Sequence, residues 1–440
     1  MINKNIFKSY DVRGIYPDEL DDRSAFAVGQ AFVKLTGCKN VVVGYDARLS
    51  SPALFLALTR GLLAQGVKVT SIGQTPTEGL YFAVGSYDFD AGIMITASHN
   101  PKDYNGFKMM VKNGNDIVWI RGKDLLSLVV ENEIKTDNLK IENLDIWPDY
   151  IKHILKFSGN IKPFKIAVDA SNGVMGSVIE MVKKHLPCEI IPLNFQPDGN
   201  FPNHSPNPLE EGSSDQITNI IKKEKADFGF MFDADADRIF LVDENGQMVS
   251  ADIVLLLLAK YFLVKNTGKG IAYNLICSRS VPEFIKKWGG VPIRTQVGFV
   301  NVREGLIKNG GIMGGELSAH YCFADYFYCD SGMIAFLTLL QIISEEKKPV
   351  SEIVKGLTIY AKPLQLTFKT DDSNVVLEKI KQKYIDGKQD YLDGVTVEYQ
   401  DWWFNLRPSN TEPVIKLTIE AKTQDLLNEK QKELSEFIGV

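Results

Sequence analysis

Short apolar runs rich in β-branched residues alternate with segments of helical period over most of this chain. Such alternation predicts repeated strand–helix units, whose strands lie largely parallel in sheets covered by helices. In the first round we expect strands at residues 40–45, 68–72 and 91–96, with a helix at 52–65. This pattern alone restricts the chain to the α/β class.

The pattern then restarts twice. The second round comprises a helix from about residue 174 and strands at 165–169, 189–193, 227–232 and 239–242. The third round starts at an apolar helix near Asp252 and continues through strands at 270–274, 291–296 and 311–316. We therefore expect three α/β domains in succession.

The last part of the chain follows a different pattern. Extended segments at 364–369, 395–400 and 414–420 frame a helix at about 375–385, and a final helix starts near Gln424. Strands with helices on one side indicate a smaller α+β domain. Breaks in polar stretches divide the 440 residues into four predicted domains, at 1–145, 146–248, 249–360 and 361–440.

The charge balance argues against a nucleic-acid-binding protein. Lys and Arg total 49 against 55 Asp and Glu, so the formal net charge is -6. A protein that binds nucleic acid through its phosphates needs a basic stripe, and none is evident. A local basic pocket for a small phosphate ester remains compatible with this balance.

The five cysteines show no CxxC spacing, which favours a reducing compartment over a disulfide framework or a zinc site. The first residues lack the apolar core of a signal peptide. The most apolar run, residues 253–264, contains Lys260 and is too short to span a bilayer. We expect a cytoplasmic protein without a membrane segment.

The sharpest local motif is Asp233-Ala-Asp235-Ala-Asp237-Arg238. In an extended backbone, carboxylates at alternate positions point to one side, where their repulsion calls for a hard cation. The motif could also be an acidic surface turn. An EF-hand is excluded, because its sixth position requires glycine and here holds Arg238.

A second motif, Thr96-Ala-Ser98-His99-Asn100-Pro101, follows a predicted strand. This order places Ser98 in an exposed loop at the carboxyl end of a strand, where α/β folds locate their sites. A serine hydroxyl needs an activating base or metal, and His99 and Lys108 are the local candidates for proton transfer. Since adjacent side chains of a strand do not face each other, no hydrolase triad is implied. A simple polar turn is the alternative.

Two further loops carry weaker signals. Gly314-Gly-Glu316-Leu-Ser318-Ala-His320 places a carboxylate and a hydroxyl on one side of an extended segment, which suits vicinal sugar hydroxyls. A common strand end with a core histidine is the alternative. Residues 407–413, Arg-Pro-Ser-Asn-Thr-Glu-Pro, combine a guanidinium with small polar groups that suit a phosphate. An ordinary hairpin with a surface arginine is the alternative there.

Together these four loops resemble those of the α-D-phosphohexomutase superfamily, in its phosphomannomutase/phosphoglucomutase branch. Residues 10–14 (Tyr-Asp-Val-Arg-Gly) and 197–204 (Pro-Asp-Gly-Asn-Phe-Pro-Asn-His) look like further family segments, so the likeness spans the whole chain. It implies three similar mixed-sheet α/β domains and a C-terminal α+β domain like the TATA-binding protein. These would form a heart shape around a central cleft.

The resemblance implies reversible transfer of a phosphoryl group between the 1- and 6-positions of a hexose phosphate, mannose and/or glucose. The implied route passes through a phosphoserine and a hexose 1,6-bisphosphate, which also serves as activator. Ser98 would carry the phosphate and, with Asp233, Asp235 and Asp237, hold magnesium (Mg2+). By the same resemblance, Arg13 and Arg238 would steady the phosphoryl group in transit, and His99 and Lys108 would assist proton transfer. The substrate would be bound by Tyr10, Glu316, Ser318, His320, Arg407, Ser409, Asn410 and Thr411.

Four positions depart from the family pattern: Ala234 and Ala319 replace glycines, Ile276 a lysine and Phe299 a histidine of some members. These changes leave the reaction intact and the preferred sugar open. The alternatives are a phosphoglucosamine mutase, a haloacid-dehalogenase-type sugar phosphatase and a non-catalytic sugar-phosphate regulator. The expected partners are small hexose phosphates, with no nucleic acid or membrane, and the protein is expected to be a monomer or homodimer.

Overall fold

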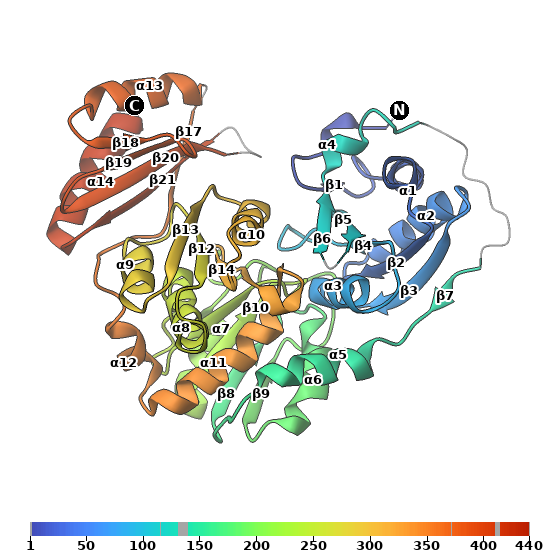
Figure 1. Ribbon diagram of the computed structural model, residues 1–440, viewed down its shortest axis with the longest axis horizontal. Coiled ribbons are helices and arrows are strands. Elements are labelled where there is room, and N and C mark those ends of the chain that lie inside the picture. Colours follow the sequence, from blue (N-terminus) through green and yellow to red (C-terminus); the bar gives the residue numbers. More distant parts are fainter. Residues whose placement is uncertain (1, 115, 131–139, 371, 410–413, 440) are drawn as a thin grey trace. The chain divides into compact units, whose positions relative to one another are not determined.

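The computed structural model describes residues 2–114, 116–130, 140–370, 372–409 and 414–439. Figure 1 shows the helices and strands along the chain. They belong to two units, one formed by Met1–Ser250 with Ser318–Ser351 and the other by Ala251–Leu317 with Glu352–Val440.

The first unit begins with a seven-stranded mixed sheet in the order β1-β5-β4-β2-β3-β7, with β6 paired to β5. β2 runs parallel to β3 and β4, whereas β5 is antiparallel to β1, β4 and β6. The strands are β1 (Val12–Ile15), β2 (Asn40–Tyr45), β3 (Lys68–Gln74), β4 (Ala91–Ile95), β5 (Tyr104–Asn113), β6 (Asp116–Ile120) and β7 (Glu142–Asn143).

Four helices accompany this sheet: α1 (Asp22–Thr36), α2 (Ser51–Leu63), α3 (Thr77–Ser86) and the short α4 (Gly122–Leu125). The sequence patterns predict α2 but leave α1 and α3 unassigned. In α3 every residue from Thr77 to Val84 is buried. A helix that is buried all round has no polar stripe, so its sequence lacks the period that identifies an amphipathic helix.

The first unit also contains a second sheet of four strands, in the order β11-β10-β8-β9. The acidic motif at residues 233–238 lies between β10 and β11. β10 is parallel to β8 and antiparallel to β11. The strands are β8 (Lys165–Asp169), β9 (Glu189–Leu193), β10 (Phe228–Phe232) and β11 (Ile239–Val242), close to the predicted bounds. The accompanying helices are α5 (Trp147–Ile154), α6 (Met175–Val182) and α7 (Asp215–Glu224).

The first unit also contains the segment after Ser318. It comprises β15 (Tyr321–Phe323), its antiparallel partner β16 (Cys329–Asp330) and the buried helix α11 (Gly332–Glu346). The chain continues through α12 (Val350–Lys355). Short 3-10 helices lie at Lys4–Ile6, Leu155–Phe157, Lys183–His185 and Ala324–Tyr326.

The second unit begins with a parallel sheet segment in which β12 (Gly270–Asn274) pairs with β13 (Val291–Thr295) and β14 (Met313–Gly315). Its helices are α8 (Ala251–Lys265), α9 (Ser280–Lys287) and α10 (Phe299–Lys308). α8 is the apolar helix that the sequence predicts near Asp252.

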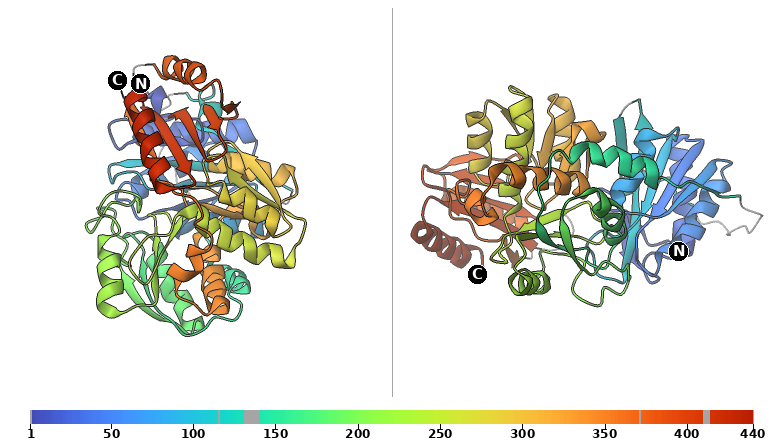
Figure 2. Two further views of the ribbon diagram at one scale, coloured as in Figure 1. Left: turned by 90° about the vertical axis from the view of Figure 1, so that its left-hand side faces the viewer. Right: turned by 90° about the horizontal axis from the view of Figure 1, so that it is seen from below.

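The same unit ends with a five-stranded antiparallel sheet in the order β17-β21-β20-β19-β18. Its helices α13 (Ser373–Lys383) and α14 (Gln424–Ile438) contribute to one shared apolar cluster with the strands, and Figure 2 shows them beside the sheet. The strands are β17 (Leu366–Lys369), β18 (Lys388–Asp390), β19 (Val395–Glu398), β20 (Trp402–Pro408) and β21 (Val414–Ala421). The predicted α/β class with a C-terminal α+β domain is confirmed.

One prediction about the last domain is wrong. The sequence analysis places Arg407 in a loop, but Arg407 lies within β20 and pairs with Lys416 of β21. Every residue of β20 from Trp402 to Arg407 is buried, including Asn405. Because both faces of this strand are covered, its sequence lacks the alternation that would identify it.

All five cysteines are free thiols. In the part of the chain that the structure describes, every helix is too short or too polar to cross a membrane.

Helices α1 and α2 cross at two glycines. A Cβ atom at Gly61 would lie 2.1 Å from the carbonyl oxygen of Phe26, and one at Gly29 would lie 2.5 Å from that of Leu58. Both clashes involve backbone atoms, which cannot rotate away. The missing side chains therefore set the distance between the two helices.

We predict that Gly61→Ala destabilises the protein by about 3 kcal/mol, at the upper end of the usual cost of overpacking. Urea unfolding followed by circular dichroism measures the change. Gly356→Ala is the matched control, since a Cβ there meets no atom within 4 Å. Equal urea midpoints for the two variants would show that the helix crossing tolerates a methyl group.

Candidate active site

Ser98 lies just beyond the carboxyl end of β4 and is buried, with 3% of its surface exposed. Its backbone is left-handed, with φ at 51°. Its Oγ lies 3.2 Å from Nδ1 of His99 and 3.4 Å from Oδ2 of Asp233. The expectation of an exposed loop is therefore wrong, because the second sheet's acidic turn covers the serine.

The expectation that the side chains of Ser98 and His99 do not face each other is also wrong. Neighbouring side chains point apart only where the backbone is extended. At Ser98 the backbone turns instead, and the hydroxyl reaches the adjacent imidazole. Burial, with Arg238 and Arg13 nearby, lowers the pKa of His99 well below its ordinary value. The imidazole is therefore neutral near pH 7, and in this form one of its ring nitrogens can accept a hydrogen bond.

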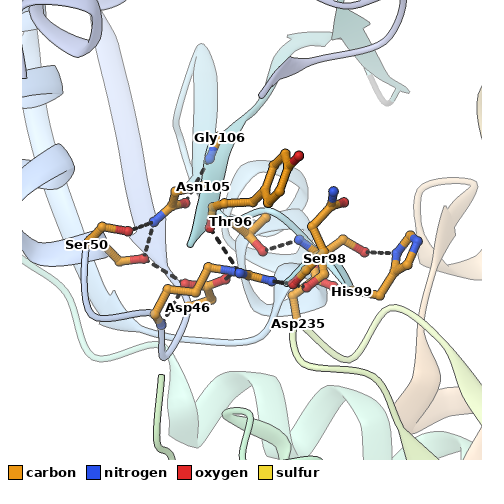
Figure 3. A network of polar contacts seen from close by, with 12 residues as sticks. Asp46, Ser50, Thr96, Ser98, His99, Asn105, Gly106 and Asp235 are labelled. Carbon is orange, nitrogen blue, oxygen red and sulfur yellow. Dashed lines mark hydrogen bonds and ion pairs between the residues drawn. The ribbon is translucent and has the colours of Figure 1, made fainter. Parts of the chain in front are cut away.

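A polar network holds the serine loop (Figure 3). The backbone N–H of Ser98 donates to Oγ1 of Thr96 at 2.8 Å. At the start of β5, where the loop ends, the side chain of Asn105 donates to the hydroxyl groups of Ser50 at 2.8 Å and Ser51 at 3.0 Å. The loop is therefore tied to the start of α2.

The acidic turn joins β10 to β11. Asp233 and Asp235 are fully buried and Asp237 is 2% exposed. Each offers a carboxylate oxygen, and these atoms all lie within 4.8 Å of one another. The predicted convergence of the three carboxylates is found, but not through an extended backbone: the segment is a turn in which Ala236 is left-handed, with φ at 61°.

These carboxylates have the character of a cation site. Oδ1 of Asp235 and Oδ1 of Asp237 are buried and accept no hydrogen bond from the residues that the structure describes. Burial, with Asp237 and Asp235 beside it, raises the pKa of Asp233 well above its ordinary value. Oxygen ligands with excess negative charge fit a hard divalent ion such as Mg2+. The residues present therefore suit the metal that the resemblance implies.

Lys108, on β5, supplies positive charge to this group. Its Nζ lies 2.6 Å from Oδ2 of Asp235 and 2.5 Å from Oδ2 of Asp237. Burial opposes the charge of this lysine, but the two carboxylates outweigh burial and raise the pKa of Lys108. The ammonium group is thus held protonated against two of the three carboxylates.

Thr77, at the start of α3, is a site residue that the sequence analysis misses. Its backbone N–H donates to the carbonyl oxygen of Asp235 at 2.9 Å, and its Oγ1 donates to Oδ2 of the same residue at 2.5 Å. These bonds fix both the backbone and the carboxylate of Asp235. No local signal could have identified Thr77, because 158 residues separate the partners.

Two arginines border the serine and the acidic turn. Nη1 of Arg13, on β1, donates to Oδ1 of Asn100 at 2.7 Å. Nε of Arg238 lies 3.5 Å from Oδ2 of Asp233, the same oxygen that faces Ser98. Tyr10 is partly buried and lies two residues before Val12, the first residue of β1.

His320 approaches the acidic turn from the segment after Ser318. Its Nε2 lies 3.3 Å from Oδ1 of Asp237 and 3.2 Å from Nε of Arg238, and its Nδ1 lies 3.0 Å from Oγ of Ser318. Oδ2 of Asp330, a residue outside all the sequence motifs, lies 3.9 Å from Nε2 of His320. Burial, reinforced by Asp237, raises the pKa of Asp330 to about 8.

Glu316 belongs to the second unit and is 3% exposed. It accepts hydrogen bonds from the backbone N–H of Gly298 at 2.8 Å and from Nδ2 of Asn274 at 3.1 Å. The carboxylate therefore joins the ends of three neighbouring segments of the parallel sheet. Ile276, one of the departures from the family pattern, follows Asn274 by two residues and is also buried.

The structure describes two of the four residues expected to bind phosphate in the last domain, Arg407 and Ser409. Arg407 is 8% exposed at the end of β20, and the backbone N–H of Ser409 donates to the carbonyl oxygen of Val414 at 2.9 Å. Asn410 and Thr411 lie outside the described residues.

The chain matches the domains of one family over most of its length. Residues 4–119 match phosphoglucomutase/phosphomannomutase alpha/beta/alpha domain I. Residues 148–246 and 250–360 match alpha/beta/alpha domains II and III of the same family, and residues 369–437 match its C-terminal domain.

Individual proteins agree with this match. A phosphomannomutase of Vibrio cholerae serotype O1 is 36% identical over 452 residues, covering 98% of this chain and 98% of that protein. A phosphomannomutase of Escherichia coli K12 is 35% identical over 431 residues, covering 94% of each. A solved phosphoglucomutase/phosphomannomutase family protein from Burkholderia thailandensis has a TM-score of 0.90 and 34% identity, covering 99% of this chain and 97% of that one.

The resemblance drawn from the loops is thereby confirmed. The alternatives of a phosphoglucosamine mutase and a haloacid-dehalogenase-type phosphatase are not favoured, since the relatives are phosphomannomutases. This chain belongs to the phosphoglucomutase/phosphomannomutase family and is a phosphohexose mutase, an isomerase that acts as an intramolecular phosphotransferase.

Proposed function

We propose that this phosphohexose mutase carries the transferred phosphoryl group on Ser98. The supporting observation is the position of its hydroxyl, 3.4 Å from Asp233 in a carboxylate group suited to a cation and 3.2 Å from a neutral histidine. A weak nucleophile needs such neighbours to react. The buried setting also keeps water away from the phosphoserine.

In this proposal a hexose 1,6-bisphosphate donates one phosphoryl group to Ser98. The bond from phosphorus to Oγ of Ser98 forms as the bond from phosphorus to the sugar oxygen breaks. The hydroxyl proton of Ser98 leaves through His99 and ends on the released sugar oxygen. The reverse step, on the other end of a hexose monophosphate, regenerates the bisphosphate and the free serine.

Asp233, Asp235 and Asp237, with the phosphate on Ser98, would hold Mg2+. When bound, this ion supplies charge neutralisation to the phosphoryl oxygens and so favours transfer. Arg238 and Arg13 border the same edge and would steady the group in transit. Lys108 would assist proton transfer from its place beside the carboxylates.

The sugar and its second phosphate would be bound by the other predicted residues. Glu316, Ser318, His320 and Tyr10 are proposed to contact the hexose, and Arg407, Ser409, Asn410 and Thr411 the phosphate that is not reacting. A phosphate at either end of the sugar could then use one distal loop. The four domain boundaries and a shared central cleft stay predictions of this scheme.

The proposed substrates are mannose and glucose phosphates, with a hexose 1,6-bisphosphate as activator. Ile276 and Phe299 replace polar residues that some family members have, so the preference between the two sugars must be measured by an assay. A cytoplasmic location, which rests on the cysteine usage, and a monomeric or homodimeric state are part of the proposal.

We predict that Ser98→Ala abolishes mutase turnover, because it removes the phosphate carrier. A coupled assay with mannose 1-phosphate measures turnover, and intact-mass analysis of the native protein should detect one phosphate that the variant lacks. Ser86→Ala, at an exposed serine of the same domain, is the matched control. Turnover of the Ser98 variant at the wild-type rate would contradict the proposal.

We predict that Asp235→Asn raises the Mg2+ concentration required for half-maximal activity at least tenfold, as one of three anionic ligands becomes neutral. EDTA should silence the native enzyme and Mg2+ should restore it. Asp227→Asn, at the start of the same β-hairpin but outside the carboxylate group, should leave the requirement unchanged. Full native activity in chelated buffer would argue against the metal.

We predict that Arg407→Ala lowers kcat/KM by about 30- to 1,000-fold, because a charge-assisted contact with phosphate is lost. Phosphorylation of Ser98 should persist, as it does not require this arginine. Lys422→Ala removes an exposed charge from the same unit and serves as control. Kinetics of the Arg407 variant within threefold of wild type for mannose and glucose 1-phosphates would remove the phosphate role.

A further inference from the structure

Arg48 is buried beside Ser98 and is part of none of the motifs found in the sequence. It lies between β2 and α2, and its side chain has no solvent exposure. A guanidinium has five N–H donors in a fixed planar fork. The arrangement around Arg48 uses all five.

Four of these donors bind backbone carbonyl groups of the serine loop. Nη2 donates to the carbonyl oxygens of Ser98 at 2.7 Å and Asn100 at 2.6 Å. Nη1 donates to those of Pro101 at 2.6 Å and Tyr104 at 3.0 Å. The loop between β4 and β5 is thus wrapped around one cation.

The fifth donor fixes the arginine itself. Nε of Arg48 donates to Oδ2 of Asp46 at 3.1 Å, while Oδ1 of Asp46 accepts from the backbone N–H of Arg48 at 3.0 Å and from Oγ of Ser51 at 2.7 Å. Asp46 therefore neutralises the buried charge and prevents rotation of the guanidinium. Figure 3 shows Asp46, Thr96 and Ser98 within the same network.

The segment 197–204, which the sequence analysis singled out without a role, covers the arginine from the second sheet's side. The ring of Phe201 lies 5.2 Å from Cζ of Arg48. Gly199 packs so closely on the Arg48 backbone that a Cβ atom would lie 2.8 Å from its Cα. An aromatic face over a guanidinium is attractive and limits its movement.

This arrangement matters because Ser98 holds an unfavourable backbone conformation. A left-handed φ is costly for a residue with a side chain and persists only where its surroundings determine it. The N–H of Ser98 is bound by Thr96 and its carbonyl oxygen by Arg48. Both peptide groups of the serine are therefore held, which fixes the direction of its Cα–Cβ bond, and Oγ then lies within reach of His99 and Asp233.

We propose that Arg48 is a positioning residue for the phosphate carrier: it holds Ser98 in the left-handed conformation that aims Oγ at Asp233 and His99, and Phe201 keeps Arg48 in place. This inference rests on the proposed role of Ser98. Lysine cannot replace Arg48, because three ammonium donors cannot satisfy five acceptors with this planar geometry.

The test compares Arg48→Lys with wild type and with Leu62→Ala, a core variant of α2 that lowers stability without touching the serine loop. The probes are mannose 1-phosphate for steady-state kinetics and glucose 1,6-bisphosphate for phosphorylation of Ser98, followed by intact mass. We expect Arg48→Lys to lower kcat about 100-fold, as small misplacements of reacting groups do, with KM within threefold of wild type. Phosphorylation of Ser98 should slow by the same factor.

Leu62→Ala should lower the melting temperature yet retain kcat within twofold at temperatures where it is folded. Arg48→Lys with kcat within threefold of wild type would overturn the proposal, as would a loss of kcat that Leu62→Ala shares. If Arg48→Lys does not fold, Phe201→Leu retains all five donors and should still lower kcat about tenfold at unchanged KM. Wild-type kcat in that variant would then overturn the proposal.

Ser98→Ala, assayed alongside, separates this inference from the function on which it rests. An active Ser98→Ala variant would refute the serine carrier itself. An inactive Ser98→Ala variant with wild-type-like Arg48→Lys would refute only the positioning role.

Discussion

Three carboxylates buried in one turn are the constraint on which the rest of the first unit depends. Charges taken out of water are costly unless opposite charges or hydrogen bonds compensate them. Here Lys108 bridges two of the carboxylates and Arg238 lies beside the third. Within the described part of the chain two carboxylate oxygens still lack a hydrogen bond, which leaves them available as ligands for a divalent cation.

The compensation comes from distant parts of the chain, and this ties the first sheet to the second. Lys108 is on β5 and Thr77 begins α3, yet both bind Asp235 of the turn between β10 and β11. The same turn places Asp233 against Ser98. The lysine that compensates the charge of the turn is on β5, which pairs with β4, and Ser98 follows β4. The contacts that compensate the buried charge therefore also hold the serine loop next to the acidic turn.

Left-handed residues mark the two loops that meet there. Ser98 and Ala236 both have positive φ, which is unfavourable for residues with a side chain. Each is held by neighbours: Ser98 by Thr96 and Arg48, and Ala236 by the backbone carbonyl group of Asp233. Local strain at Ser98 is thus supported by hydrogen bonds from Thr96 and Arg48, two residues with no proposed chemical step of their own.

The sequence by itself determined the class of the fold, most strands of the repeated units and the chemical identity of the main site residues. Strand and helix periods are local properties, and the bounds of β8, β9 and β11 follow from them. Among the elements that the sequence patterns miss, α3 and β20 are buried on all sides and have no polar face, so neither shows a period. Only the tertiary structure decided that Ser98 is buried, that it faces His99, and that Thr77 and Arg48 belong to the site. Those facts depend on contacts between residues that are far apart in the chain and on backbone turns that side-chain patterns do not encode.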